Sequence, residues 1–117
     1  MKKILGLILI VFLGIQCNAQ SACTSSLSED LFQIELKKIK AYDFDQAKKK
    51  DIENLLSQCP TCNQIKQLLH ELSFEQDKLD IIKKAYSKVS DPINFAVIKA
   101  VLDFEESKNI INELIRE

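Results

Sequence analysis

Apolar side chains recur at helical spacing along most of the chain beyond residue 28. Ile65, Leu68, Leu69 and Leu72 form one such stripe. Positions i, i+3, i+4 and i+7 fall on one face of a helix because the helix has 3.6 residues per turn. Three further stripes are formed by Ile52, Leu55 and Leu56, by Leu79, Ile82, Ala85, Tyr86 and Val89, and by Ile111, Leu114 and Ile115. The pattern predicts six helices, at residues 28–41, 44–57, 62–72, 74–88, 92–102 and 104–116.

Three helix starts repeat at an interval of thirty residues. Phe44, Phe74 and Phe104 share this spacing and similar neighbours, and Lys48, Lys78 and Lys108 keep the same register. The residue before each phenylalanine is a good N-cap, because a short side-chain oxygen can accept a hydrogen bond from a free N–H group of the first turn. A Gln or Glu three residues later completes a capping box. We therefore expect three of the helices to be capped by Asp43, Ser73 and Asp103.

A second set of predicted caps lies midway between these starts. Thr61 with Gln64 has the pattern of a capping box, and Asp91 precedes a proline at the first helical position. The predicted fold class is all-α: about six helices stacked as antiparallel helical hairpins in a short solenoid with a thirty-residue repeat. The alternative is an ordinary helical bundle whose helix starts look alike because they need the same chemistry. Residues 93–102 are apolar nearly all round, so we expect this helix to be the central and most buried one.

The first nineteen residues have the pattern of a signal peptide. Lys2 and Lys3 precede an apolar run at residues 4–15, and this run is shorter than the roughly twenty residues that span a membrane. Small residues at positions 17 and 19 predict cleavage between Ala19 and Gln20. Lipidation of Cys17 is the alternative, but Gln16 fits a lipoprotein site badly. The expected organisation is a signal peptide at 1–19, a flexible leader at 20–27 and one helical domain at 28–117, in a periplasmic or secreted protein.

Charge gives no reason to expect nucleic-acid binding. The chain has 16 basic and 17 acidic side chains, a net charge of −1, and its short lysine runs are flanked by acidic residues. After residue 19 no segment is long and apolar enough to span a membrane. With 46% apolar and 28% charged residues and two residues each of Gly and Pro, the composition is that of a globular helical protein.

The segment from Leu72 to Phe95 resembles a family known as domain of unknown function 4476. The resemblance lies in the helix start at residues 72–75 with Leu79, in Ala85-Tyr86 followed by Asp91 and Phe95, and in Phe104 with Ser107. It extends over residues 30–117. It implies an exported, all-helical protein of the kind found in Gram-negative bacteria, with relatives in some animals and no established activity. The Cys59-Pro60-Thr61-Cys62 turn is not a hallmark of the family.

The cysteines are the first candidates for chemistry. Removal of the signal peptide leaves Cys23, Cys59 and Cys62, an odd number for an oxidising compartment. Cys59 and Cys62 form a C-x-x-C motif with Cys62 at a helix start, where the helix dipole would lower a thiol pKa. One interpretation is a thiol–disulfide exchange site. The other is a structural disulfide, either Cys59–Cys62 closing the turn or Cys23 tying the leader to one of them.

Other candidate residues have simpler interpretations. His70 is the only histidine and offers no second imidazole for a zinc site, so we expect a surface residue and no metal or cofactor. Tyr86 and Phe95 fall on core stripes and are expected to pack. We identify no catalytic residues and expect no enzymatic activity. The favoured function is a protein-interaction or structural module with an unidentified protein partner; the alternative is a small thiol–disulfide exchange protein using Cys59 and Cys62.

Overall fold

The computed structural model describes residue 23 and residues 25–116. In this part of the chain there are helices but no strands, so the predicted all-helical class is confirmed. The predicted signal peptide, its cleavage point between Ala19 and Gln20, and Cys17 lie outside the described residues. Within residues 25–116 the six long helices are α2 (Glu29–Lys40), α3 (Asp45–Leu55), α4 (Cys62–Leu69), α5 (Glu75–Ala85), η2 (Pro92–Val101) and α6 (Glu105–Arg116), with a short 3₁₀ turn η1 (Leu56–Gln58) after α3.

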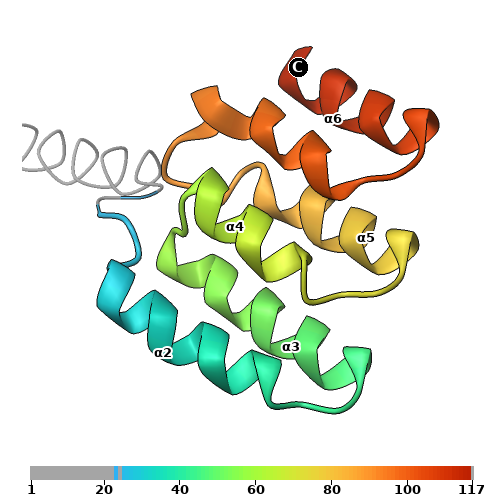
Figure 1. The fold of residues 1–117 in the computed structure, drawn as a ribbon. Coiled ribbons are helices and arrows are strands. Elements are labelled where there is room, and N and C mark those ends of the chain that lie inside the picture. The colour runs from blue at the N-terminus through green and yellow to red at the C-terminus, as the bar shows by residue number, and fades with distance from the viewer. Residues whose placement is uncertain (1–22, 24, 117) are drawn as a thin grey trace, which may run out of the picture.

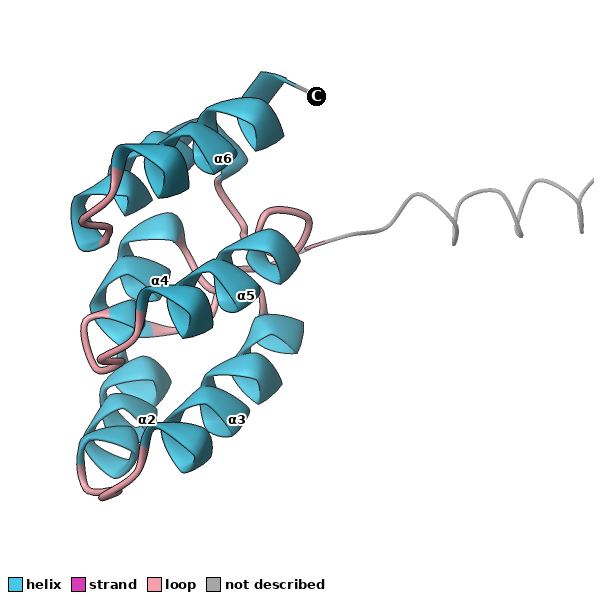
Figure 2. Ribbon diagram, turned by 90° about the vertical axis from the view of Figure 1, so that its right-hand side faces the viewer, coloured by secondary structure: helices cyan, strands magenta, loops and turns pink. Residues whose placement is uncertain are grey.

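The long helices run back and forth in three antiparallel pairs (Figure 1). The pairs α2/α3, α4/α5 and η2/α6 lie one above another, and Figure 2 shows the same order from the side. Between neighbouring pairs, α4 packs against η2, α3 against α5, and α5 against α6. As a result α3, α5 and α6 all begin at the same edge of the molecule, on the right-hand side of Figure 1.

The core is built from the stripes that the sequence predicts. Ile65, Leu68 and Leu69 on α4 are fully buried, and so are Ile52 on α3 and Ile82 on α5. Burying one such side chain stabilises the fold by about 1.5–3 kcal/mol, so this shared interior holds the helix pairs together. Helix α4 is the most buried of them, with five of its eight residues shielded from solvent: Cys62, Gln64, Ile65, Leu68 and Leu69.

The helix predicted at residues 92–102 is present, but the expectation that it is the central one is wrong. It is a 3₁₀ helix, and it lies in the last pair of helices. A 3₁₀ helix has three residues per turn, so Phe95, Ile98 and Val101 fall on one buried face. Ile93 and Val97 lie off that face and are 91% and 44% exposed. The high apolar content of this segment therefore does not correspond to burial on all sides.

Tyr86 and Phe95 pack against each other, as expected for core residues. Their rings are 4.9 Å apart between centroids and meet edge to face at 76°. This is a favoured geometry for aromatic pairs. The contact joins the end of α5 to the buried face of η2 and so helps to hold the last helix pair on the one before it.

Candidate functional site

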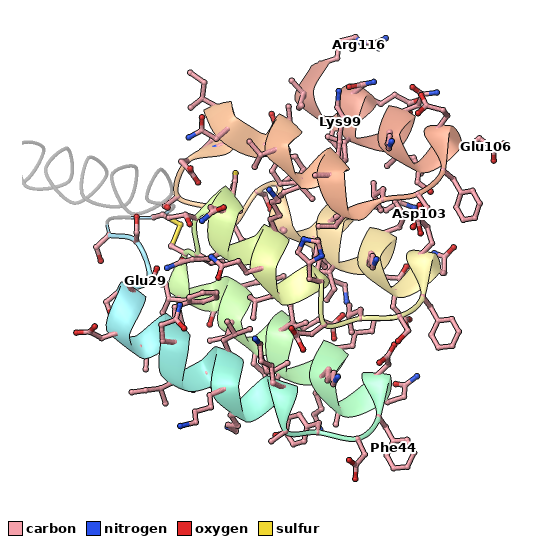
Figure 3. The ribbon with its side chains drawn as sticks, viewed as in Figure 1. Glu29, Phe44, Lys99, Asp103, Glu106 and Arg116 are labelled. Atoms are coloured by element: carbon pink, nitrogen blue, oxygen red, sulfur yellow. A yellow bond between two sulfur atoms is a disulfide. The ribbon has the colours of Figure 1, made fainter. Side chains whose placement is uncertain are left out.

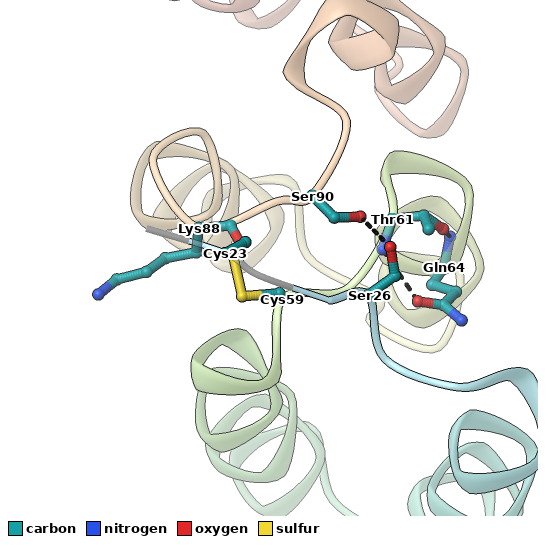
Figure 4. Close-up of a disulfide and its surroundings, with 7 residues drawn as sticks. All are labelled: Cys23, Ser26, Cys59, Thr61, Gln64, Lys88 and Ser90. Carbon is teal, nitrogen blue, oxygen red and sulfur yellow. Dashed lines mark hydrogen bonds between the residues drawn. A yellow bond between two sulfur atoms is a disulfide. The ribbon is translucent and has the colours of Figure 1, made fainter. Parts of the chain in front are cut away.

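Cys23 and Cys59 form a disulfide, which joins the segment before α2 to the turn between η1 and α4 (Figure 4). The sequence left the pairing open, and the structure has Cys23 tying the leader to the C-x-x-C turn. The two Cα atoms are 5.8 Å apart, and the pair closes a loop across 36 positions of sequence. Cys59 has φ 56° and ψ 60°, a left-handed conformation that costs a non-glycine residue about 1–2 kcal/mol. The sharp turn at Cys59 is thus stabilised by a covalent bond.

Hydrogen bonds connect three segments around this disulfide: the stretch before α2, the turn before α4 and the loop before η2. The Leu27 N–H donates to the Cys59 carbonyl at 3.0 Å, and the Ser90 N–H donates to the Pro60 carbonyl at 2.9 Å. The Ser26 hydroxyl donates to Ser90 Oγ at 2.9 Å (Figure 4). These contacts and the burial of Leu27 hold residues 25–27, the last part of the leader expected at residues 20–27, against the α4 turn.

Cys62 is the free cysteine of the described chain, and it is buried. Its thiol donates to the Asp91 carbonyl at 3.1 Å, and its N–H donates to Asp91 Oδ1 at 2.7 Å. Burial, together with the nearby Asp91 carboxylate, raises the pKa of the Cys62 thiol to about 12. The expectation of a lowered pKa at this helix start is therefore wrong, because desolvation and a neighbouring negative charge outweigh the helix dipole.

His70, the remaining candidate for chemistry, is exposed at the C-terminal end of α4. Among residue 23 and residues 25–116, no group of three or more His, Cys, Asp or Glu side chains has the arrangement of a metal site. No helix in that part of the chain is both long and apolar enough to cross a membrane. The described surface hollows are shallow and open, such as the one on α3 lined by Gln46, Lys50 and Glu53.

The predicted helix caps are only partly right. Thr61 caps α4 with a complete capping box: its hydroxyl accepts from the Gln64 N–H at 3.1 Å, and the Gln64 side chain accepts from the Thr61 N–H at 2.9 Å. Asp91 is the N-cap residue of η2, but its side chain makes no capping bond to that helix. Instead, its carboxylate accepts from the Cys62 N–H and from the Asn94 side chain.

The caps predicted at Asp43, Ser73 and Asp103 are displaced by one residue. Phe44 and Phe74 are the N-cap residues of α3 and α5, and neither can make a side-chain capping bond. Phe104 has the same position before α6, because its carbonyl accepts from the N–H four residues later, as the carbonyls of Phe44 and Phe74 do. The Ser73 and Asp103 N–H groups are bonded to carboxylates of other helices, which holds these residues outside the helices.

Those carboxylates belong to a pair of contacts that recurs thirty residues apart. Asp45 Oδ2 accepts from the Ser73 N–H at 2.7 Å, and Glu75 accepts from the Asp103 and Phe104 N–H groups at 3.1–3.2 Å. Burial alone would raise the pKa of Glu75, but the hydrogen bonds from Phe104 and Asp103 outweigh it, so the pKa is lowered. Each carboxylate thus fixes the start of the next helix along this edge.

A lysine accompanies each of these carboxylates. Lys48 Nζ donates to the Glu71 carbonyl at 3.4 Å, and Lys78 Nζ donates to the Val101 carbonyl at 2.9 Å. Each bond spans 23 residues of sequence. The two lysines are thirty residues apart, and so are the two carbonyls, so this contact also repeats at an interval of thirty. Each lysine lies in the first turn of the second helix of one pair and reaches a carbonyl at or just after the end of the first helix of the next pair. Both lysines are half-buried, and their ammonium groups are engaged with these carbonyls.

The phenylalanines at these three helix starts are exposed. Phe44, Phe74 and Phe104 have 75%, 65% and 61% of their surface open to solvent. Figure 3 labels Phe44, whose ring projects away from the ribbon at the edge where α3 begins. Single exposed apolar residues are ordinary on protein surfaces. Three exposed aromatic residues at the same position of successive helix starts form a defined surface, which we name the Phe row.

Sequence reasoning missed the Phe row as a surface, because it used these residues only to mark the repeat. The apolar pattern gives no signal for their exposure, because Phe104 lies seven residues before Ile111 and so in register with the stripe of its helix. The charged side chains beside the row are acidic, with Asp43, Asp103 and Glu106 all exposed. Asp103 and Glu106 lie at the same edge as the start of α6 in Figure 3. The surface that the edge offers is thus aromatic and negatively charged.

Comparison with known proteins places the chain in a family. The family described as domain of unknown function DUF4476 matches residues 25–115. The chain belongs to the DUF4476 family. Searches of the curated proteins and of the solved structures find no match to it. The DUF4476 match runs from before α2 to all but the last residue of α6 and includes the C-x-x-C turn and the Phe row, whereas Cys23 lies two residues before it.

Proposed function

We propose that this DUF4476 protein is an exported, non-enzymatic module that binds another protein through the Phe row. The observation that carries the proposal is the exposure of Phe44, Phe74 and Phe104 at the same position of three helix starts. Exposed apolar surface loses the stabilisation that burial would give, about 1.5–3 kcal/mol per phenylalanine. Aromatic residues are enriched where proteins bind one another, and exposed apolar patches mark such sites.

The proposal includes a repeat architecture, a short solenoid of antiparallel helical hairpins. Its support is a contact pattern that recurs after thirty residues. A carboxylate and a lysine in the first turn of α3, Asp45 and Lys48, bond to the next helix pair, and Glu75 and Lys78 of α5 do the same. Glu105 has the corresponding position on α6. Solenoids present extended surfaces made of equivalent positions from successive repeats, and the Phe row has this character.

The two ends of the stack fit this architecture. Terminal repeats of solenoids need polar outer faces for solubility. On α6, Asn109 and Asn112 stand thirty residues after the buried Leu79 and Ile82 of α5. At the other end, the exposed Lys38 of α2 stands thirty residues before the buried Leu68 of α4. The sequence changes from apolar to polar at the positions where a further helix pair would otherwise pack.

The thiol-exchange alternative receives less support. A C-x-x-C exchange site works through a reactive thiolate on one cysteine of the pair and a disulfide between the two. Here Cys59 is bonded to Cys23, and the pKa of the Cys62 thiol is raised to about 12, so that thiol is protonated at neutral pH. The Cys23–Cys59 disulfide agrees better with a structural bond in an exported protein, because disulfides persist mainly in oxidising compartments.

Site-specific photo-cross-linking tests the proposed function. The photoreactive residue p-benzoyl-phenylalanine would replace Phe44, Phe74 or Phe104, one at a time, in cells that naturally make the protein. Ile93 is the matched control position, because it is apolar, 91% exposed and on η2, which begins at the opposite edge of the stack. We expect the same protein to be cross-linked from all three positions of the row and not from position 93. Absence of an adduct from the row, or equal capture from position 93, would contradict the proposal.

A further inference from the structure

The interval between the phenylalanines restricts what can lie along the row. Helices α3, α5 and α6 pack side by side, and packed helices have axes about 8–10 Å apart. Their first residues are tied together by the bonds from Asp45 to Ser73 and from Glu75 to Phe104. Successive rings therefore recur about every 8–10 Å along the edge. A polyproline II helix rises about 3.1 Å per residue with three residues per turn, so one of its faces recurs every 9.3 Å or so.

The hydrogen bonding of the backbone at this edge also favours a partner in the polyproline II conformation. The N–H groups of Ser73, Asp103 and Phe104 already donate to Asp45 and Glu75, and so they offer nothing to an added β-strand. An amphipathic helix needs a groove for its apolar face, whereas the three rings of the row are exposed, each at the start of a helix. A polyproline II segment suits this surface because it makes no internal hydrogen bonds and its proline residues have no N–H group. Such segments bind aromatic side chains in several recognition domains.

The charge of the surface beside the row determines the charge that we expect of the partner. The exposed charged groups beside the row are carboxylates, those of Asp43, Asp103, Glu105 and Glu106. The lysines at the same helix starts are half-buried and engaged: Lys48 and Lys78 donate to the Glu71 and Val101 carbonyls, and Lys108 is paired with Glu105. Complementary charge speeds association and excludes partners of like charge. A segment with basic side chains between its prolines would place those side chains against the carboxylates.

From this spacing, backbone chemistry and charge we propose that the Phe row binds a basic, proline-rich segment of a partner protein in the polyproline II conformation. A proline of each turn packs against one phenylalanine, and arginine or lysine side chains lie toward the flanking carboxylates. This inference rests on the proposed protein-binding function and names the chemistry of the partner.

Synthetic peptides test the inference with the mature protein. The probe is acetyl-(Pro-Pro-Arg)₄-amide, titrated by calorimetry at about 50 mM salt, where the Debye length is about 14 Å, longer than at physiological ionic strength. Acetyl-(Gly-Gly-Arg)₄-amide has the same charge without the polyproline II preference, and acetyl-(Pro-Pro-Glu)₄-amide reverses the charge. The test variant is F44A/F74A/F104A, and the matched control is I93A/V97A, which removes exposed apolar side chains from η2. All five positions are exposed, and circular dichroism verifies that both variants stay folded.

The expected result is binding of the Pro-Pro-Arg peptide to the wild type and to I93A/V97A, with at least a tenfold loss of affinity in F44A/F74A/F104A. The D103N/E106Q variant is expected to weaken binding several-fold and to reduce its salt dependence. Equal affinity for the Gly-Gly-Arg peptide, no loss in F44A/F74A/F104A, or no binding at all would overturn the inference. So would Phe-dependent binding to vesicles of phosphatidylethanolamine and phosphatidylglycerol without binding of the peptide, because the occupant would then be a membrane.

The cross-linking experiment separates the two proposals. If the row captures one protein that has no basic proline-rich stretch, and the Pro-Pro-Arg peptide does not bind, the inference fails and the proposed function stands. If the row captures no protein, the proposed function fails, and the inference fails with it.

Discussion

Glu75 provides the sharpest test of how the helix pairs are joined. Its carboxylate accepts from the Asp103 N–H at 3.1 and 3.2 Å and from the Phe104 N–H at 3.1 Å. Hydrogen bonds to a charged group contribute about 1.5–3 kcal/mol each, but both N–H groups lie in an exposed turn where water can partly replace the lost acceptor. We therefore expect Glu75→Ala to lower the free energy of unfolding by about 2 kcal/mol.

The chain offers a matched control for this substitution. Glu105 is in register with Glu75, but its side chain is 84% exposed and its ion pair is with Lys108 at 3.6 Å on the same helix. An exposed pair of this kind is worth about 0.2–0.5 kcal/mol, so Glu105→Ala should be close to neutral. Asp45→Ala removes one bond, from the Ser73 N–H, and should fall between the two variants at about 1 kcal/mol.

Urea unfolding followed by circular dichroism at 222 nm measures all three variants. The change in free energy is taken from the midpoint at constant slope, so that a change in the denatured state is recognised. In thermal unfolding, a loss of about 2 kcal/mol corresponds to a fall in Tm of about 8–16 °C for a domain of this size. Equal losses in the Glu75 and Glu105 variants, or no loss in the Glu75 variant, would refute the reasoning that this carboxylate joins one helix pair to the next.

The remaining predictions concern the disulfide, the buried thiol and acid stability. Cys23→Ser should lower the free energy of unfolding by about 3–4 kcal/mol, the chain-entropy value for a loop closed across 36 residues. Adding reductant to the wild type should lower its Tm to about that of the Cys23→Ser variant. Cys62 should resist Ellman's reagent at pH 8 in the native protein and react once urea unfolds it, since its thiol is buried with a pKa of about 12; rapid native labelling would contradict this. Because the pKa of Glu75 is lowered on folding, its contribution to stability is present above the unfolded pKa of about 4.3 and is lost as pH falls through the lower folded pKa. Glu75→Gln should therefore show a shallower fall in stability below pH 4 than the wild type, and an unchanged slope would count against the role given to this carboxylate.

Apolar periodicity was sufficient to predict the helices but not their exact starts. The stripes on α4 and α5 are buried as expected, because a helix that packs on one side must hide one face. The predicted caps at Asp43, Ser73 and Asp103 are one residue too early. A capping rule considers only the residues next to a helix start, whereas the N–H groups of Ser73 and Asp103 are bonded to carboxylates about thirty residues earlier in the chain. Thr61 was predicted correctly because its capping box is wholly local.

The candidate site was harder to predict than the fold. Two features of it depend on which segments meet in three dimensions. The pairing of Cys23 with Cys59 requires the leader to lie along the α4 turn, and the high pKa of Cys62 requires Asp91 beside it. The Phe row was visible as a thirty-residue spacing, but its exposure follows from the position of each ring at a helix start, outside the face that packs. A spacing alone does not reveal which way a side chain points.

Fluorine NMR of residues 20–117 labelled with 4-fluorophenylalanine tests the central claim most directly, because each phenylalanine gives its own signal. Phe32 and Phe95 are fully buried, whereas the three residues of the Phe row are more than half exposed. We predict that a soluble paramagnetic reagent broadens the three signals of the row and spares the other two. Addition of the partner captured by cross-linking should then shift those three signals and protect them from the reagent. Broadening of the Phe32 or Phe95 signal by the reagent, or an unchanged row in the presence of bound partner, would contradict the account.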